Sequence, residues 1–222
     1  MKRTIILSLA VLAAAALLVG CKGGSKKAAD TPEPAEETPK MSEQDLAAAL
    51  AALPAEPVFN IVTNLGTIKV KLYEKTPLHR ENFAKLALSG YYDGLLFHRV
   101  INGFMIQGGD PLTKDKANVA KFGTGGPDYT VPAEFVPEYR HKKGALAAAR
   151  RGDAANPMKA SSGSQFYLVQ DEAACAQLDG QYTVYGETLE GLDVIDKIAA
   201  VETGARDCPV SDVKILRVEL SE

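Results

Sequence analysis

The feature that most constrains the fold is a strict alternation of apolar and polar side chains over residues 67–72. Ile68, Val70 and Leu72 are apolar, whereas the residues between and before them are threonine and lysine. This period of two is typical of a strand with one buried and one exposed face. An apolar segment over residues 58–63 precedes Asn64-Leu65-Gly66, a turn segment, so the sequence predicts a β-hairpin.

Helices and a closing strand accompany this hairpin. Pro77 follows Thr76, and proline is favoured in the first turn of a helix. Gly90 lies where a left-handed residue would end that helix. The pattern predicts a second helix at 192–199 and a final strand at 213–220. Mostly short strands with two helices indicate a β-barrel with covered ends.

The first twenty residues are predicted to be a targeting segment and not part of the fold. Two basic residues precede an apolar run over residues 5–19, which is shorter than the about 20 residues that a membrane-spanning helix needs. The run ends in Leu18-Val19-Gly20-Cys21, which resembles the lipobox of bacterial lipoproteins. That resemblance implies removal of residues 1–20 and acylation of Cys21. We therefore expect an exported lipoprotein in the cell envelope, at the outer membrane or periplasmic face and not in the cytoplasm. The alternatives are a plain signal peptide and a short membrane anchor.

The next segment, residues 21–41, is predicted to be a flexible tether. It carries three prolines and many charges, and no aliphatic side chain larger than alanine before its last residue. Such a stretch buries too little surface to offset its ordering entropy, and it reaches roughly 25 Å. Ser42 is an N-cap candidate with Asp45 three residues later, so residues 42–56 are predicted to form a short helix and linker. The folded domain is expected over 57–222.

Charge and motif spacing exclude several classes of function. The formal net charge of −3 and the absence of a long basic run argue against nucleic-acid binding. His79, His98 and His141 lack metal-ligand spacing, and we predict neither metal nor cofactor. Ser164 is not part of a Gly-x-Ser-x-Gly motif, which argues against a serine hydrolase.

The segment most informative about chemistry is Phe97–Asp110, which sets one guanidinium and one amide among apolar and aromatic side chains. Arginine is rarely buried unpaired, so Arg99 either has a partner or faces a cleft; the alternative is a core strand whose arginine reaches solvent. This segment resembles the cyclophilin signature over its whole length, and the similarity extends over about residues 57–220. Further family segments are matched by Gly123–Gly126, Gly163–Tyr167, Leu178–Gly180 and Thr183–Gly186.

The resemblance implies a mainly β fold, an eight-stranded antiparallel closed β-barrel capped by two α-helices. It also implies a peptidyl-prolyl cis–trans isomerase that acts, without a cofactor, on proline-containing segments of unfolded or exported proteins. The sequence leaves the oligomeric state open, and our expectation is a monomer. Rotation about an X–Pro bond is slow because amide resonance opposes it, with a barrier of about 18–20 kcal/mol. A catalyst needs only to favour the twisted imide, whose nitrogen becomes a better hydrogen-bond acceptor. The alternative is a catalytically weak, peptide-binding chaperone or scaffold.

By the resemblance, Arg99 supplies the fixed donor, because a guanidinium stays charged and presents a rigid fork of N–H groups. Phe104 and Gln107 complete the predicted catalytic set. The backbone around Ala149 and Arg150 would pair with a bound peptide like an added strand. The predicted substrate-binding residues are His98, Met105, Ala149, Arg150, Gln165, Tyr167, Leu178 and Tyr182.

Some positions depart from the family pattern. Gln177 stands where many members have tryptophan, which predicts reduced cyclosporin sensitivity. Arg150 replaces a frequent asparagine and is expected to shift substrate preference, and Tyr167 replaces a common phenylalanine. Cys175 and Cys208 remain after Cys21; an exported protein permits a disulfide between them, and two free thiols are the equal alternative.

Overall fold

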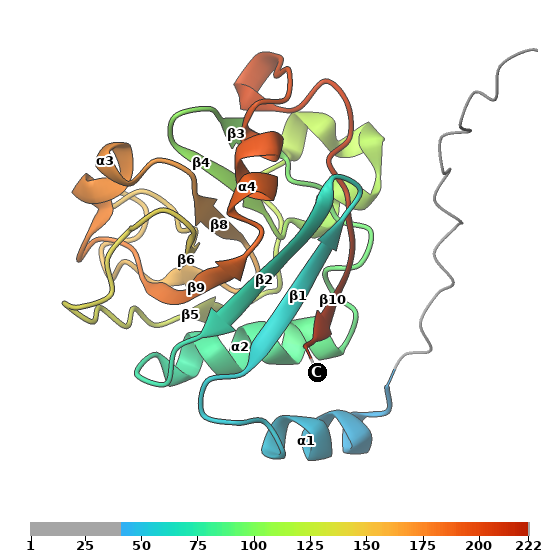
Figure 1. Ribbon diagram of the computed structural model, residues 1–222, viewed down its shortest axis with the longest axis vertical. Helices are drawn as coiled ribbons and strands as arrows, with labels where there is room; N and C mark the ends of the chain where they lie inside the picture. The colour runs from blue at the N-terminus through green and yellow to red at the C-terminus, as the bar shows by residue number, and fades with distance from the viewer. Residues whose placement is uncertain (1–40, 222) are drawn as a thin grey trace, which may run out of the picture. The chain divides into compact units, whose positions relative to one another are not determined.

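The computed structural model describes residues 41–221, so the predicted signal peptide, Cys21 and most of the predicted tether lie outside the described residues. An eight-stranded antiparallel sheet forms the body of the domain (Figure 1). Its strands are β1 (Val58–Thr63), β2 (Gly66–Leu72), β3 (Arg99–Ile101), β4 (Met105–Gly108), β6 (Ala145–Ala148), β8 (Phe166–Val169), β9 (Val184–Glu190) and β10 (Ile215–Leu220). They follow the spatial order β10-β1-β2-β9-β6-β8-β4-β3, and β5 (Thr130–Val131) pairs separately with β7 (Ser161–Ser162).

The predicted hairpin is the pair β1 and β2, in which Thr63 lies opposite Gly66. The sheet curls so that its two edges approach each other. Leu95 and Phe97 lead into the edge strand β3 and form hydrogen bonds with the chain at the start of β10: the N–H of Ile215 donates to Leu95 (2.8 Å) and that of Phe97 donates to Val213 (2.9 Å). The mainly β, barrel-like architecture predicted from the sequence is therefore confirmed.

The helices begin and end close to the predicted residues. Thr76 precedes α2 (Pro77–Leu88), and Gly90 follows it with a φ of +69°, a conformation that suits glycine. The second predicted helix is α4 (Leu192–Ala199). The remaining helices are α1 (Glu43–Ala51), α3 (Glu172–Cys175), η1 (Pro111–Lys114), η2 (Lys116–Lys121), η3 (Ala176–Leu178) and η4 (Ala205–Asp207).

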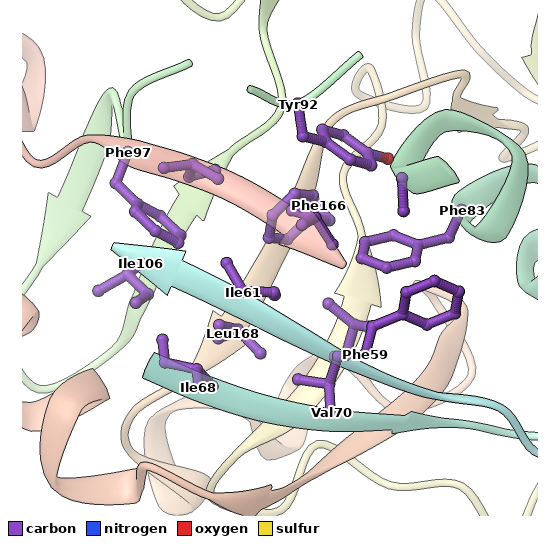
Figure 2. Packing of buried hydrophobic residues seen from close by; sticks show 14 of the residues in the cluster. Phe59, Ile61, Ile68, Val70, Phe83, Tyr92, Phe97, Ile106, Phe166 and Leu168 are labelled. Atoms are coloured by element: carbon purple, nitrogen blue, oxygen red, sulfur yellow. The ribbon is translucent and has the colours of Figure 1, made fainter. Parts of the chain in front are cut away.

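Aromatic rings fill the main core between α2 and the concave face of the sheet (Figure 2). Phe83 of α2 packs edge-to-face against Phe59 (5.8 Å between ring centroids) and against Phe166 (5.7 Å). Tyr92 completes the group, 5.2 Å from Phe83. Such pairs add about 0.5–1.5 kcal/mol each beyond the burial of their area.

The central strands β6 and β8 are buried on both faces, and this arrangement positions the functional site. In β8, Phe166 and Leu168 join the main core, whereas Tyr167 and Val169 belong to a second apolar cluster. Successive side chains of a strand point to opposite faces. The second cluster, which also contains Met105, is therefore a platform on the other side of the sheet.

The short helix α1 begins as predicted, with the Ser42 hydroxyl accepting a hydrogen bond from the N–H of Asp45 (3.2 Å). Leu50 and Leu53 pack against the domain, and the Arg80 guanidinium of α2 donates to the carbonyl of Ala55 (2.8 Å). Among residues 41–221, no helix combines the length and apolar character needed to cross a membrane.

Candidate active site

A pocket of about 560 Å³ opens above the second apolar cluster. Ten of the eleven predicted catalytic and substrate-binding residues line it, and Gln165 is the exception. Five further residues line the pocket: Phe122, Gly123, Arg206, Asp207 and Cys208. Gly123 belongs to the glycine segment that the resemblance placed beside the site, whereas the other four were not predicted as site residues.

Strand pairing places the two polar residues of the predicted catalytic set side by side. Arg99 of β3 lies directly opposite Gln107 of β4, and its Nη1 lies 3.4 Å from the Gln107 side-chain oxygen, a long hydrogen bond. Gln107 in turn donates to the side chain of Gln165 (3.0 Å), which donates to the carbonyl of Gly125 (2.7 Å). Gln165 therefore lies behind the pocket wall, where it holds Gln107.

A second group approaches the Arg99 guanidinium from the loop that contains η4. The Asp207 carboxylate lies 3.5 Å from Nε of Arg99, and the two side chains are 47% and 42% exposed. Gln107 takes one N–H of Nη1, and Asp207 lies beside Nε. Among the described residues, the second N–H of Nη1 and both N–H groups of Nη2 are left to donate to a ligand.

The η4 loop holds Asp207 in an uncommon backbone conformation. Arg206 and Asp207 have φ values of 60° and 59°, in the left-handed region that non-glycine residues rarely adopt. The Arg206 guanidinium donates to the carbonyls of Ala120 (2.9 Å) and Val119 in η2. The loop is therefore fastened across the rim of the pocket, with its carboxylate beside Arg99.

The glycine-containing wall of the pocket is also fixed by one side chain. The Asp110 carboxylate is fully buried and accepts hydrogen bonds from the N–H groups of Gly123 (2.5 Å), Gly125 (3.1 Å) and Leu112 (2.8 Å). This single acceptor orders a segment that belongs to no strand of the sheet.

His98 lies under this wall and is 4% exposed. Burial lowers the pKa of its imidazole, although the Asp110 charge opposes that shift. Its ring nitrogens are buried, and the Leu96 backbone also favours the charged form of the ring. His98 therefore lines the pocket as a buried imidazole whose charged form is disfavoured overall.

Apolar and aromatic side chains form the floor and the opposite wall. Met105 and Tyr167 are almost fully buried in the floor. Arg150 lies over the ring of Tyr182, 4.4 Å from its centroid, and donates to the carbonyl of Gln181 (2.9 Å) and to Asp153 (2.6 Å). The Arg150 guanidinium thus stabilises the wall that contains Tyr182.

Part of the predicted peptide-pairing edge is already occupied. The N–H of Ala149 donates to Gln165 (3.0 Å), and the carbonyl of Ala149 accepts from Ser162 (2.8 Å). The Ala149 N–H is therefore engaged inside the domain, whereas its carbonyl oxygen keeps a second lone pair. That the backbone around Ala149 and Arg150 pairs with a bound peptide stays a prediction.

Both cysteines of the domain are free thiols in the structure. Cys175 is buried in α3, with its thiol 3.4 Å from the carbonyl of Phe104, whereas Cys208 lies at the pocket rim. The structure therefore contains free thiols, the second of the two alternatives left open by the sequence. Gln177 is exposed and lies outside the residues that line the pocket.

A serine, a histidine and a glutamate also meet away from the pocket, which the sequence analysis did not predict. Nε2 of His79 is 2.9 Å from the Ser161 hydroxyl, and Nδ1 is 2.6 Å from Glu134. Ser161 is 1% exposed, and Glu134 also accepts the N–H groups of Leu78 and His79 at the start of α2 (3.0 Å each). This group therefore stabilises the helix start and is closed to a substrate.

The comparisons with known proteins agree on one family. The model of the family "Cyclophilin type peptidyl-prolyl cis-trans isomerase/CLD" matches residues 58–220. The chain is 37% identical to the mouse peptidyl-prolyl cis-trans isomerase-like 1 over 174 residues, which cover 76% of this chain and 97% of that protein. It is also 37% identical to the Arabidopsis thaliana peptidyl-prolyl cis-trans isomerase CYP18-1 over 160 residues, covering 71% and 92%.

Solved structures give the same result. A crystal structure of a Cryptosporidium parvum cyclophilin type peptidyl-prolyl cis-trans isomerase superposes with a TM-score of 0.66 at 27% identity, covering 75% of this chain and 98% of that one. A second crystal structure of that protein, in the presence of the dipeptide Ala-Pro, has a TM-score of 0.65 at 27% identity, covering 74% and 99%.

Proposed function

Because the chain belongs to the cyclophilin family of peptidyl-prolyl cis–trans isomerases, we propose that Arg99 is the fixed donor that speeds rotation about X–Pro bonds. We further propose that the enzyme works on exported proteins from a lipid anchor at Cys21. The observation that carries the first proposal is the position of Arg99. Its guanidinium stands at the edge of an apolar floor and is held by Gln107 and Asp207.

The reaction requires only that the site place a hydrogen-bond donor correctly. As the imide twists, its nitrogen loses conjugation and becomes a stronger hydrogen-bond acceptor, while no covalent bond is broken. A donor that meets this nitrogen binds the twisted state more tightly than either planar state, which lowers the barrier. The N–H groups of Nη1 and Nη2 that Gln107 and Asp207 leave free are the donors that we assign to this role.

The apolar residues serve a separate purpose. Met105, Tyr167 and Leu178 form a pocket for the proline ring, so that rotation moves the chain on one side of the bond relative to a held ring. The relative crystallised in the presence of Ala-Pro supports a proline-containing peptide as the ligand.

The test of Arg99 is its replacement by alanine. We expect Arg99→Ala to lower kcat/KM for a proline peptide by about 10²–10³-fold, as the removal of one well-placed donor does elsewhere. The control is Arg217→Ala on β10, which removes an arginine of similar exposure (46%) paired with Glu219. Equal rates for wild type and Arg99→Ala in a protease-coupled assay would favour the alternative, a peptide-binding module.

The anchoring proposal rests on the lipobox-like Leu18–Cys21 and on the tether composition of residues 21–41. A tether of roughly 25 Å would hold the domain close to a membrane surface, within reach of newly exported chains. We expect a labelled fatty acid to be incorporated into the wild type but not into Cys21→Ser, and the wild type to fractionate with membranes. An unlabelled, freely released wild-type protein would contradict the proposal.

A further inference from the structure

The second histidine group in the domain lies directly beneath the pocket. His141 is 1% exposed and lies between Asp179 and Tyr167. Its Nδ1 is 2.8 Å from Asp179, and its Nε2 is 2.8 Å from the Tyr167 hydroxyl. A carboxylate only accepts hydrogen bonds, so Nδ1 carries the proton. Burial lowers the pKa of His141, so the ring is neutral and Nε2 accepts from the Tyr167 hydroxyl.

This histidine connects two separate walls of the pocket. Tyr167 comes from β8 in the floor, whereas Asp179 directly follows Leu178 in the wall that ends at Tyr182. The rings of Tyr167 and Tyr182 meet edge-to-face, 6.1 Å apart. One imidazole therefore fixes the floor residue and the start of the wall at once.

We propose that His141 is a positioning residue of the proline pocket, which keeps the Tyr167 hydroxyl turned away from the pocket and holds the Leu178 wall against the floor. The inference rests on the proposed function only in that this pocket receives the proline ring. Asp179 would keep other partners without the imidazole, because it also accepts from the backbone N–H of His141 (2.8 Å) and from Arg140 (2.8 Å). The group that depends on the imidazole is the Tyr167 hydroxyl.

The consequence of losing the imidazole follows from the cost of an unpaired polar group. Tyr167 is 4% exposed, so its hydroxyl has few alternatives to Nε2. Without that acceptor, the hydroxyl is left unsatisfied or turns to water in the pocket, and either outcome opposes an apolar ring. The pocket holds the ring equally in the planar and twisted states, so the loss appears in KM and not in kcat.

The chain offers a matched control, the group of His79, Glu134 and Ser161. It too places a buried imidazole between a carboxylate and a hydroxyl, but none of its members lines the pocket. A purely structural role for His141 would make the two histidines equivalent in kinetics.

The deciding experiment compares three variants of the full chain with wild type. We expect His141→Leu, which keeps a similar volume, to raise KM for a proline peptide by about three- to tenfold while kcat stays within about twofold. Adding Tyr167→Phe to His141→Leu should return KM towards the wild-type value, because no orphaned hydroxyl remains. His79→Leu should lower the melting temperature without raising KM. The proposal is wrong if the double variant binds no better than His141→Leu, if His141→Leu leaves KM unchanged, or if His79→Leu raises KM equally.

A measurement on the wild type covers the case in which His141→Leu does not fold. Imidazole ¹⁵N NMR should show His141 with its proton on Nδ1, and saturation with Ala-Pro should shift its Nε2 resonance but not that of His79. A proton on Nε2, or an unmoved resonance, would overturn the proposal. Arg99→Ala, assayed alongside, separates the two ideas: if it alone is without effect, the donor mechanism fails while the role of His141 stands.

Discussion

Asp207 offers a quantitative test of how Arg99 is held. We expect Asp207→Asn to lower kcat/KM, because the variant loses the charge that orients Nε of Arg99. Asparagine tolerates the left-handed backbone that Asp207 adopts, so the loop should keep its path. The pair is long, at 3.5 Å, and both side chains are almost half exposed. Exposed ion pairs contribute about 0.2–1 kcal/mol, which corresponds to a loss of about 1.4- to fivefold.

The assay is a comparison of kcat and KM at low and high salt. Between about 0.05 M and about 0.5 M salt, screening should reduce the wild-type rate towards that of Asp207→Asn, whose own rate should depend less on salt. The control is Asp153→Asn, which removes a carboxylate from Arg150 on another wall of the pocket. If Asp207→Asn is as active as wild type or more active, the carboxylate does not orient Arg99 for catalysis.

Three further outcomes follow from the described contacts. Gly109→Ala should lower the free energy of unfolding by about 2 kcal/mol or more, because a Cβ there would lie 2.3 Å from a backbone oxygen; Gly103→Ala, where the same atom meets open space, should cost clearly less in a urea titration. Burial opposes ionisation of Glu134, but hydrogen bonds from the buried imidazole and the start of α2 hold its pKa below 4.5. The stability that the ionised Glu134 contributes to the fold is therefore complete above pH 4.5 and is lost as the pH falls through the lowered pKa. The difference in melting temperature between wild type and Glu134→Gln should shrink over that acidic range. Burial raises the pKa of Cys175 to about 12, so a thiol reagent should modify Cys208 first in the folded domain; equal rates would contradict the burial of Cys175.

Elements governed by local pattern were predictable from the sequence. The hairpin of β1 and β2 follows from alternation and a turn, and α2 follows from a proline at its start and Gly90 after its end. The final strand was also placed, although β10 begins at Ile215 and not at residue 213. These features need only neighbours in the sequence, so pattern alone is sufficient.

The site was predictable where it coincides with the signature segments and unpredictable where distant loops meet it. Asp207 reaches Arg99 because Arg206 and Asp207 both adopt a left-handed backbone conformation. That conformation could not be predicted from an arginine followed by an aspartate. Outside the pocket, His79 meets Glu134 and Ser161 across 55 and 82 positions of the chain in the same way. Contacts between such distant segments form only once the sheet has folded, and they produce no periodic pattern in the sequence.

The buried carboxylate of Asp110 has a consequence for ligand entry. Because it anchors Gly123 and Gly125 before any peptide arrives, that side of the cavity loses little conformational entropy on association. An incoming segment therefore meets a ready-made surface, and more of its contact energy is left for binding.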